Sequence, residues 1–280
     1  MTISEIQKNY REALSSVYDE REARSVTNLV FEKILELQSH KISLEKFRIL
    51  TAPQIDRLNG VLQRLLSHEP VQYILEEADF YGLKFKVNKH VLIPRPETEE
   101  LVAWVKAEVA DLRSKILDIG TGSGCIPISL AKEFPEAEIE GVDISEEAVL
   151  IATENNNINR TKVKFERLDI LNEGLKHNYY DFVISNPPYI GLPEAAEMAA
   201  NVLKFEPHLA LFAPAGDDLI FYRQISDKGF TALKAGGKLF FEINYLKGEE
   251  VTSIMEATGF KGVELRKDIN GKNRMIKGEK

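Results

Sequence analysis

The stretch Ile116–Gly124 reads Ile-Leu-Asp-Ile-Gly-Thr-Gly-Ser-Gly, and it decides the fold of the chain. Its apolar half is typical of a buried strand, and its glycines let the chain turn tightly and bring the backbone against a ligand. The spacing GxGxG differs from the dinucleotide pattern GxGxxG, and the sequence contains no GxxxxGK[ST] phosphate loop. The stretch therefore predicts a strand, a glycine loop and a helix, with either a ligand against the loop or a turn that binds none.

Strand and helix patterns alternate on the carboxyl-terminal side of this stretch. Each expected strand is a short apolar run, and each expected helix has apolar residues three or four positions apart. Such alternation predicts an α/β fold with a mostly parallel sheet and helices on both faces. The expected strands are Lys115–Ile119, Ala137–Asp143, Lys162–Asp169, Asp181–Ser185 and Lys238–Ile243, with two closing strands near Val263 and Met275. The expected helices begin near Ile126 and at Ser145, and later run near Asp217–Leu233 and over Glu249–Thr258.

Residues 1–75 have a different pattern, which predicts a small bundle of four amphipathic helices. Thr2 and Glu5 have the spacing of a capping box in front of the first helix. Leu44 and Phe47 are the centre of a short third helix. A fourth helix is expected to begin after Thr51, where Pro53 and Gln54 strengthen the start signal.

Between the two patterns, apolar and polar residues alternate from Leu83 to Asn88, which predicts a half-buried strand. Pro94 and Pro96 then exclude helix from their flanks before a helix that carries Leu101 and Val105. We therefore expect a helical bundle over 1–75, a hairpin linker over 76–96, and the sheet domain over 97–280.

The composition is that of an ordinary globular protein, with 44% hydrophobic and 29% charged residues. The formal net charge of −8 opposes attraction to nucleic-acid phosphates, so we expect no direct nucleic-acid partner. The single cysteine, Cys125, and five scattered histidines give no disulfide and no paired metal-ligand spacing, so no metal is expected. The chain has no signal-peptide pattern and no apolar run of membrane-spanning length, so we expect a soluble, cytoplasmic protein without membrane contact.

An acidic residue in front of GxGxG resembles the motif of S-adenosylmethionine-dependent methyltransferases. On that basis Asp143, at the end of the next strand, is expected to accept both hydroxyls of a ribose, because Ser145 already caps the following helix. Asp169 and Ile170, at the end of the third strand, are expected to contact an adenine amino group and cover its ring, although a solvated Asp at a strand end fits nearly as well. Asp118 is expected to hold the glycine loop or to meet the amino group of the cofactor.

The tetrapeptide Asn186-Pro187-Pro188-Tyr189 directly follows the apolar strand Asp181–Ser185. Without a ligand it would be a rigid turn that leaves the sheet. As a catalytic corner it would orient a planar amide nitrogen, which is a poor nucleophile because its lone pair is delocalised. The Asn186 side-chain oxygen and the Pro187 carbonyl would each accept one N–H, the prolines would add no competing donor, and Tyr189 would stack on the planar group.

Taken together, these motifs resemble the bacterial release-factor glutamine methyltransferases, the PrmC/HemK family of class I S-adenosylmethionine-dependent methyltransferases with a Rossmann-like sheet of seven strands and an antiparallel edge. The resemblance rests on DIGTGSG, Asp143 and NPPY, on Ile93–Glu99 (IPRPETE) in front of them, and on Glu206-Pro207-x-Leu209-Ala210-Leu211 behind them. NPPY alone is shared with DNA adenine-N6 methyltransferases. The IPRPETE segment makes the combination highly specific.

The resemblance implies that the chain methylates the side-chain amide nitrogen (N5) of the glutamine in the Gly-Gly-Gln motif of peptide release factors. It implies that S-adenosylmethionine is the cofactor and that the amino-terminal bundle helps to grip the release factor. We also expect a monomer, although no motif of the sequence indicates the oligomeric state. The implied cofactor contacts are Gly120, Thr121, Gly122, Ser123, Gly124, Asp143, Ile170 and Asn186. The implied substrate contacts are Asn186, Pro187, Pro188 and Tyr189, with Arg95 and Glu97 beside the site.

Two segments depart from the family pattern. The family often has Glu-x-Gly after the late strand, where this chain reads Glu242-Ile243-Asn244. The segment 215–219 only approximates the usual glycine-rich turn. Asp268-x-x-Gly271-x-x-Arg274 does match, and its simplest interpretation is a hairpin turn.

Two alternatives stay open at this stage. An adenine-N6 methyltransferase acting on DNA or RNA would present the same conjugated NH₂ group to the same tetrapeptide, although the acidic charge of the chain opposes it. A non-catalytic scaffold would retain the fold without the reaction, although the intact glycines and NPPY oppose that.

Overall fold

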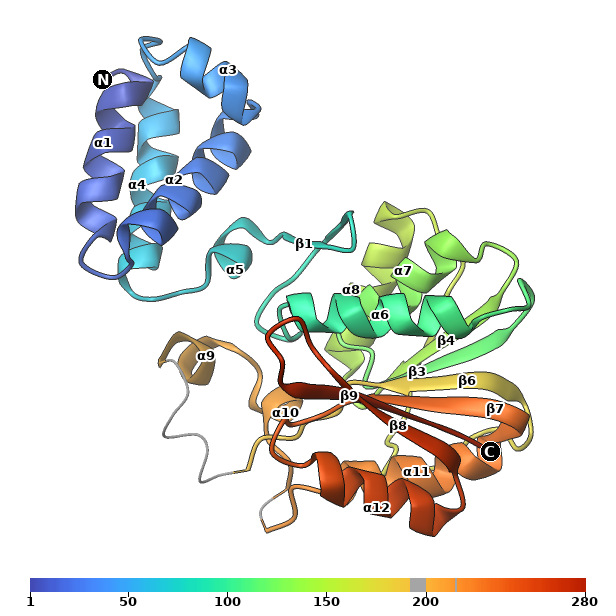
Figure 1. Ribbon diagram of the computed structural model, residues 1–280. Coiled ribbons are helices and arrows are strands. Elements are labelled where there is room, and N and C mark those ends of the chain that lie inside the picture. The colour runs from blue at the N-terminus through green and yellow to red at the C-terminus, as the bar shows by residue number, and fades with distance from the viewer. Residues whose placement is uncertain (192–199, 215) are drawn as a thin grey trace. The chain divides into compact units, whose positions relative to one another are not determined.

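The computed structural model describes residues 1–191, 200–214 and 216–280, which form two compact units. The first comprises Met1–Glu76 together with helix α9 (Ala200–Phe205), and the second contains the other described residues from Glu77 onward (Figure 1). Each unit has its own hydrophobic core.

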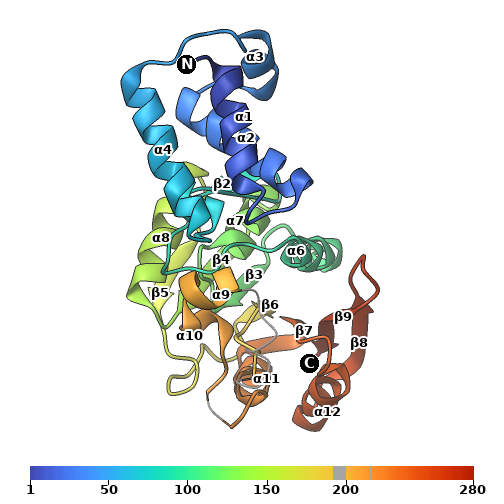
Figure 2. The same cartoon turned by 90° about the vertical axis from the view of Figure 1, so that its left-hand side faces the viewer.

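The first unit is helical, as its sequence pattern predicts. Its helices are α1 (Ile3–Leu14), α2 (Glu20–Leu35), α3 (Ser39–Leu44), α4 (Ala52–Leu66) and α5 (Val71–Leu75). Figures 1 and 2 show α1, α2 and α4 side by side, and Tyr10 of α1 reaches α4 by donating to the Leu58 carbonyl. The capping box of α1 is present, because Thr2 and Glu5 exchange backbone-to-side-chain hydrogen bonds. Thr51 is the N-cap of α4, as predicted.

The third helix differs from the prediction. α3 ends at Leu44, and the side chains of Leu44 and Phe47 are 81% and 75% exposed. Only Ile42 of this helix is buried, since six residues make too few turns to present an apolar face.

The second unit begins with an antiparallel hairpin of β1 (Ala78–Phe80) and β2 (Leu83–Phe85). Helix α6 (Pro96–Glu108) follows, with Arg95 as its N-cap and Pro96 at its first position, where the missing N–H costs nothing.

The main sheet has seven strands in the order β5-β4-β3-β6-β7-β9-β8. All pairings from β5 to β7 are parallel, and β9 is antiparallel to both of its neighbours, so the predicted mostly parallel sheet with an antiparallel edge is confirmed. The strands are β3 (Lys115–Ile119), β4 (Glu138–Asp143), β5 (Lys164–Arg167), β6 (Tyr180–Ser185), β7 (Leu233–Glu242), β8 (Lys261–Lys267) and β9 (Asn273–Glu279). The other helices are α7 (Cys125–Glu133), α8 (Glu146–Ile158), α10 (His208–Leu211), α11 (Ile220–Ala232) and α12 (Gly248–Thr258).

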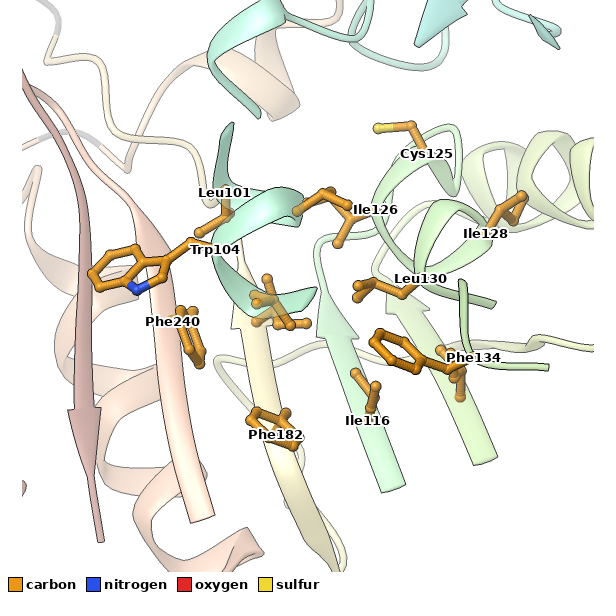
Figure 3. Packing of buried hydrophobic residues seen from close by; sticks show 14 of the residues in the cluster. Leu101, Trp104, Ile116, Cys125, Ile126, Ile128, Leu130, Phe134, Phe182 and Phe240 are labelled. Carbon is orange, nitrogen blue, oxygen red and sulfur yellow. The ribbon is translucent and has the colours of Figure 1, made fainter. Parts of the chain in front are cut away.

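Helices cover both faces of this sheet, because successive strand residues point to opposite sides. In β6, Phe182 and Ile184 belong to the core under α6 and α7, whereas Val183 belongs to the core under α11 and α12. Figure 3 shows the first core, where Trp104 of α6 meets Phe240 of β7 edge to face at 5.4 Å between ring centroids.

The strand order reverses its direction of growth at β3, which lies between β4 and β6. The loops after β3, β4 and β6 therefore leave the sheet at one edge, where open α/β sheets bind their ligands. The glycine loop, Asp143 and the NPPY tetrapeptide follow these three strands in turn.

We expect Gly141→Ala to destabilise the protein by about 1–3 kcal/mol, because overpacking a close-packed core forces its neighbours to shift. A β carbon at Gly141 of β4 would lie 2.6 Å from Phe165 Cε1 and 2.8 Å from Thr121 Oγ1. Gly60→Ala in α4 is the matched control: no heavy atom lies within 4 Å of its β carbon. We expect it to stabilise by roughly 0.5–1 kcal/mol, because glycine weakens a helix interior. Urea unfolding followed by circular dichroism measures both changes, and equal effects of the two substitutions would contradict the packing described at Gly141.

Candidate active site

A cavity of about 680 Å³ opens at this edge of the sheet, within the second unit. The loops after β3, β4 and β6 contribute polar groups to its lining. The apolar residues of the lining include Ile170, Phe212, Phe221 and Ile225. The predicted site residues that line it are Gly120, Gly122, Ser123, Asp143, Asp169, Ile170, Asn186, Pro187, Pro188 and Arg95. Those that do not line it are Asp118, Thr121, Gly124, Tyr189 and Glu97.

The glycine loop needs its glycines for two different reasons. The φ angles are positive at Gly120 (74°), Gly122 (54°) and Gly124 (78°). Residues other than glycine rarely adopt such angles. At Gly124, the N-cap of α7, a β carbon would also lie 3.0 Å from both Ile128 Cδ1 and Phe165 Cζ. The third glycine therefore lets the helix approach the sheet, and the first two bring the backbone to the cavity wall.

The loop is fixed to β4 by its backbone amides. Gly120 N and Thr121 N both donate to the Val142 carbonyl, at 2.9 and 3.0 Å, and Gly122 N donates to Asp143 Oδ2 at 2.8 Å. The loop conformation is thus formed by the protein itself.

Asp143 is less free than the sequence suggests. Ser145 caps α8 as predicted, accepting from Ala148 N at 3.2 Å, but the second Asp143 oxygen accepts from Ser145 N at 3.0 Å. Burial raises the pKa of Asp143, and the backbone amides of Ser145 and Gly122 oppose that rise. Each carboxylate oxygen keeps a second lone pair, so the side chain still has acceptor capacity toward the cavity that it lines.

Asp118 lies buried at the end of β3, and neither of its oxygens has a hydrogen bond of ordinary geometry to any described residue. Burial raises its pKa to about 7, and the nearby Thr121 hydroxyl lowers it only in part. The hydroxyls of Thr121 and Ser123 likewise have no such bond within the described chain. Unpaired buried polar groups cost about 1–3 kcal/mol each, and of these three residues only Ser123 lines the cavity.

The third strand expected for the sheet domain is β5, which ends at Arg167. Asp169 and Ile170 therefore lie after this strand and not at its end. Both line the cavity. Asp169 also accepts from Leu171 N at 2.9 Å and Asn172 Nδ2 at 2.8 Å, and the Asn172 bond is the main cause of its lowered pKa. Its carboxylate thus lies in the cavity lining and also organises its own turn, a role that the sequence analysis did not consider.

The NPPY tetrapeptide leaves the end of β6, where Ser185 Oγ donates to the Ile119 carbonyl of β3 at 2.7 Å. Asn186, Pro187 and Pro188 line the cavity. Tyr189 does not: its ring packs against the core under α11 and α12, and its hydroxyl donates to Glu242 Oε1 at 3.4 Å. The expected stacking of Tyr189 on a substrate amide therefore has no support from its position.

Arg95 and Glu97 separate at the start of α6. Arg95 lines the cavity and pairs with the buried Glu206 at 2.5 Å, which joins IPRPETE to the later Glu-Pro motif. Glu97 instead lines a second cavity of about 360 Å³, together with Glu99 and Glu100. Because adjacent helix residues point about 100° apart, Thr98 faces the main cavity and Glu97 does not.

Sequence reasoning missed two residues at the site, Thr98 and Glu242. Thr98 Oγ1 donates to Glu242 Oε2 at 2.6 Å, and Asn186 Nδ2 donates to Thr98 Oγ1 at 3.3 Å. Burial raises the pKa of Glu242 to about 6. The available signals were a threonine within IPRPETE and an acidic residue at the end of an apolar strand.

In the ranges 1–191, 200–214 and 216–280, no group of three His, Cys, Asp or Glu side chains is arranged to hold a metal ion. The same ranges contain no helix with the length and apolar content needed to cross a membrane.

Two solved structures share the fold at low sequence identity. A methyltransferase from Pyrococcus furiosus superposes with a TM-score of 0.51 at 15% identity, over 82% of this chain and 98% of that chain. The hMettl16 catalytic domain superposes with a TM-score of 0.57 at 16% identity, over 81% and 82%.

Sequence comparisons identify the family. Residues 5–75 match the model of the PrmC N-terminal domain, and residues 97–205 match that of the methyltransferase small domain. The release factor glutamine methyltransferase of Flavobacterium psychrophilum is 42% identical over 96% of this chain and 98% of its own length. The enzyme of that name from Bacteroides thetaiotaomicron is 43% identical over 95% and 96%. With this identity over nearly its whole length, the chain belongs to the release factor glutamine methyltransferases.

Proposed function

We propose that this protein transfers a methyl group from S-adenosylmethionine to the side-chain amide nitrogen (N5) of the glutamine in the Gly-Gly-Gln motif of peptide release factors. The observation that carries the proposal is that Asn186, Pro187 and Pro188 line the same cavity as the glycine loop and Asp143. A donor site and an amide-orienting corner are thus adjacent. The relatives that cover the whole chain bear the name of this activity.

The donor half of the cavity fits S-adenosylmethionine. The backbone of Gly120 and Gly122 would lie against the ligand, Asp143 would accept from ribose hydroxyls, and Asp169 and Ile170 would contact the adenine. Asp118 does not line the cavity, so its expected contact with the amino group of the cofactor has no support from its position. When bound, S-adenosylmethionine supplies an electrophilic methyl group on a sulfonium.

The acceptor half addresses the low nucleophilicity of an amide nitrogen, whose lone pair is delocalised into its carbonyl. The Asn186 side-chain oxygen and the Pro187 carbonyl would each accept one N–H of the substrate amide. Proline at 187 and 188 fixes the backbone and adds no competing N–H donor. Catalysis is then mainly alignment, which can account for about 7–11 kcal/mol of a barrier. The methyl–sulfur bond would break as the nitrogen–methyl bond forms, leaving S-adenosylhomocysteine. One proton of the amide nitrogen would pass to water, so the scheme needs no dedicated base.

The presence of a separate helical unit favours a protein as the substrate. We assign it the recognition of the release factor, and we place the reaction of the monomeric enzyme in the cytoplasm, with residues 76–96 as the linker to the methyltransferase domain. An adenine-N6 methyltransferase is not favoured, because the relatives along the full chain have a protein glutamine in their name and the net charge is −8. A non-catalytic scaffold is not favoured, because the family consists of enzymes.

We expect Asn186→Ala to lower the single-turnover methylation rate at least about 100-fold, because one of the two groups that orient the substrate amide is removed. Binding of S-adenosylhomocysteine should stay within about threefold, since the glycine loop and Asp143 remain. Rapid quench with a tritiated methyl donor and a purified release factor measures the rate, and calorimetry measures binding. Asn157→Ala, at an exposed position of α8, is the control. A rate for Asn186→Ala equal to that of Asn157→Ala would exclude the role.

We expect Asp143→Ala to weaken binding of S-adenosylhomocysteine by roughly tenfold or more, since hydrogen bonds to a charged group contribute about 1.5–3 kcal/mol. The substitution removes the ribose acceptor and also the partner of Gly122 N. Glu146→Ala removes an exposed carboxylate three residues later, at the first position of α8, and should change the dissociation constant by less than about twofold. Titration calorimetry compares the two, and similar affinities would argue against Asp143 as a cofactor ligand.

A further inference from the structure

The Asn186 side chain is held by a hydrogen-bonded chain of three residues from distant parts of the sequence. Asn186 Nδ2 donates to Thr98 Oγ1 at 3.3 Å, and Thr98 Oγ1 donates to Glu242 Oε2 at 2.6 Å. Thr98 and Glu242 are each only 2% exposed, so the Thr98–Glu242 bond is shielded from bulk water. Within the described chain, the Thr98 bond is the one side-chain hydrogen bond of Asn186.

The protons available on these three side chains determine which group donates in each hydrogen bond. An ionised carboxylate can only accept, so the single hydroxyl proton of Thr98 must point to Glu242. Thr98 Oγ1 then has only lone pairs left for Asn186, so it is the NH₂ end of the asparagine amide that must face Thr98. The amide oxygen of Asn186 is thereby turned to the opposite side.

We propose that Thr98 and Glu242 are positioning residues which, through this directed chain, fix the amide of Asn186 with its oxygen available to accept from the substrate in the main cavity. The inference rests on the proposed function, in which that oxygen accepts an N–H of the target glutamine. The two ends of an asparagine amide have nearly the same shape, so packing alone cannot distinguish them. A flipped Asn186 would oppose its own NH₂ to the NH₂ of the substrate.

The charge state of Glu242 controls the direction of the chain. Thr98 and Glu97 of α6, Tyr189 after β6 and Arg274 of β9 are the groups that act on Glu242. Thr98 and Tyr189 donate to it, Arg274 attracts its negative charge, and Glu97 opposes it. Asp268 pairs with Arg274 at 3.4 Å, and the Tyr222 hydroxyl bonds to the Glu242 backbone oxygen at 3.5 Å.

Burial raises the pKa of Glu242 to about 6. Above that pH the carboxylate only accepts, so Asn186 donates to Thr98 and Thr98 donates to Glu242. Below it, the protonated carboxyl can donate to Thr98, which frees the hydroxyl proton of Thr98 for the Asn186 oxygen. Activity should therefore be lost as the pH falls through about 6.

The kinetic test compares Thr98→Val, which removes the hydroxyl at nearly constant shape, with Thr98→Ser, which retains it. For Thr98→Val we expect kcat to fall about tenfold or more, with KM for the release factor and cofactor binding within about threefold. Thr98→Ser should restore kcat to within about twofold of the unsubstituted protein. Thr252→Val removes a hydroxyl that donates to the Gly248 carbonyl in α12 and serves as the matched control.

A second test needs no catalysis. In the free ¹⁵N-labelled protein, the side-chain NH₂ resonances of Asn186, identified by their loss in Asn186→Asp, should titrate with a midpoint near pH 6. The titration should disappear in Glu242→Gln and in Thr98→Val. A merely structural role for Thr98 would leave the titration of these resonances and the acid limb of kcat unchanged.

The outcomes separate the two proposals. If the unsubstituted enzyme fails to methylate a release factor but the Asn186 resonances titrate with Glu242, the proposed function is wrong and the positioning chain stands. If the enzyme is active and Thr98→Val matches Thr252→Val in kcat, the positioning chain is wrong. Asn186 resonances that do not respond between pH 5 and 8 overturn it as well, and this measurement on the unsubstituted protein does not depend on the folding of any variant.

Discussion

The active site depends on the reversal of strand order at β3. Because β4 and β6 flank β3 in parallel register, the loops that follow all three strands leave the sheet at one edge. No side chain of the glycine loop or of NPPY needs to reach far across the molecule. The Ser185 hydroxyl bond to the Ile119 carbonyl fixes the ends of β6 and β3 directly beneath the two motifs. The separation of the glycine loop and the NPPY tetrapeptide thus follows from the spacing of neighbouring strands, about 4.8 Å.

Hydrogen bonding divides the cavity into a satisfied part and an unsatisfied part. The backbone of the glycine loop is paired with Val142 and Asp143, so the loop is formed before any ligand arrives. Asp118, Thr121 and Ser123 lie beside it without ordinary partners in the described chain. Of the three, only Ser123 lines the cavity, and burying unpaired groups lowers the stability of the protein. The glycine loop is therefore preorganised at some cost to stability.

The features that the sequence predicts correctly are the local ones. Lys115–Ile119 is a strand and Ser145 caps α8, because each depends on residues a few positions apart. The structure places Gly120, Gly122 and Asn186 in the cavity lining. The sequence does not predict which distant residues meet. Thr98 and Glu242 are 144 positions apart, and Arg95 and Glu206 are 111 apart. Such pairs depend on strand register and helix rotation, which also explains why Arg95 lines the cavity while Glu97 turns to another.

Burial of Glu242 gives it two properties that cannot be separated. A carboxylate at the surface would be solvated by water, and water would satisfy Thr98 equally well in either direction. Burial makes the direction of the Thr98–Glu242 bond unambiguous, because the single hydroxyl proton of Thr98 then has the Glu242 carboxylate as its acceptor. The same burial raises the pKa of Glu242 toward the range in which the cell works, because a buried charge loses its hydration. Tyr189 and Arg274 limit this rise, which gives the last residue of NPPY a role behind the cavity rather than inside it. The NPPY corner thus combines two kinds of group: Asn186 and the prolines face the cavity, while Tyr189 supports the carboxylate that keeps Asn186 correctly oriented.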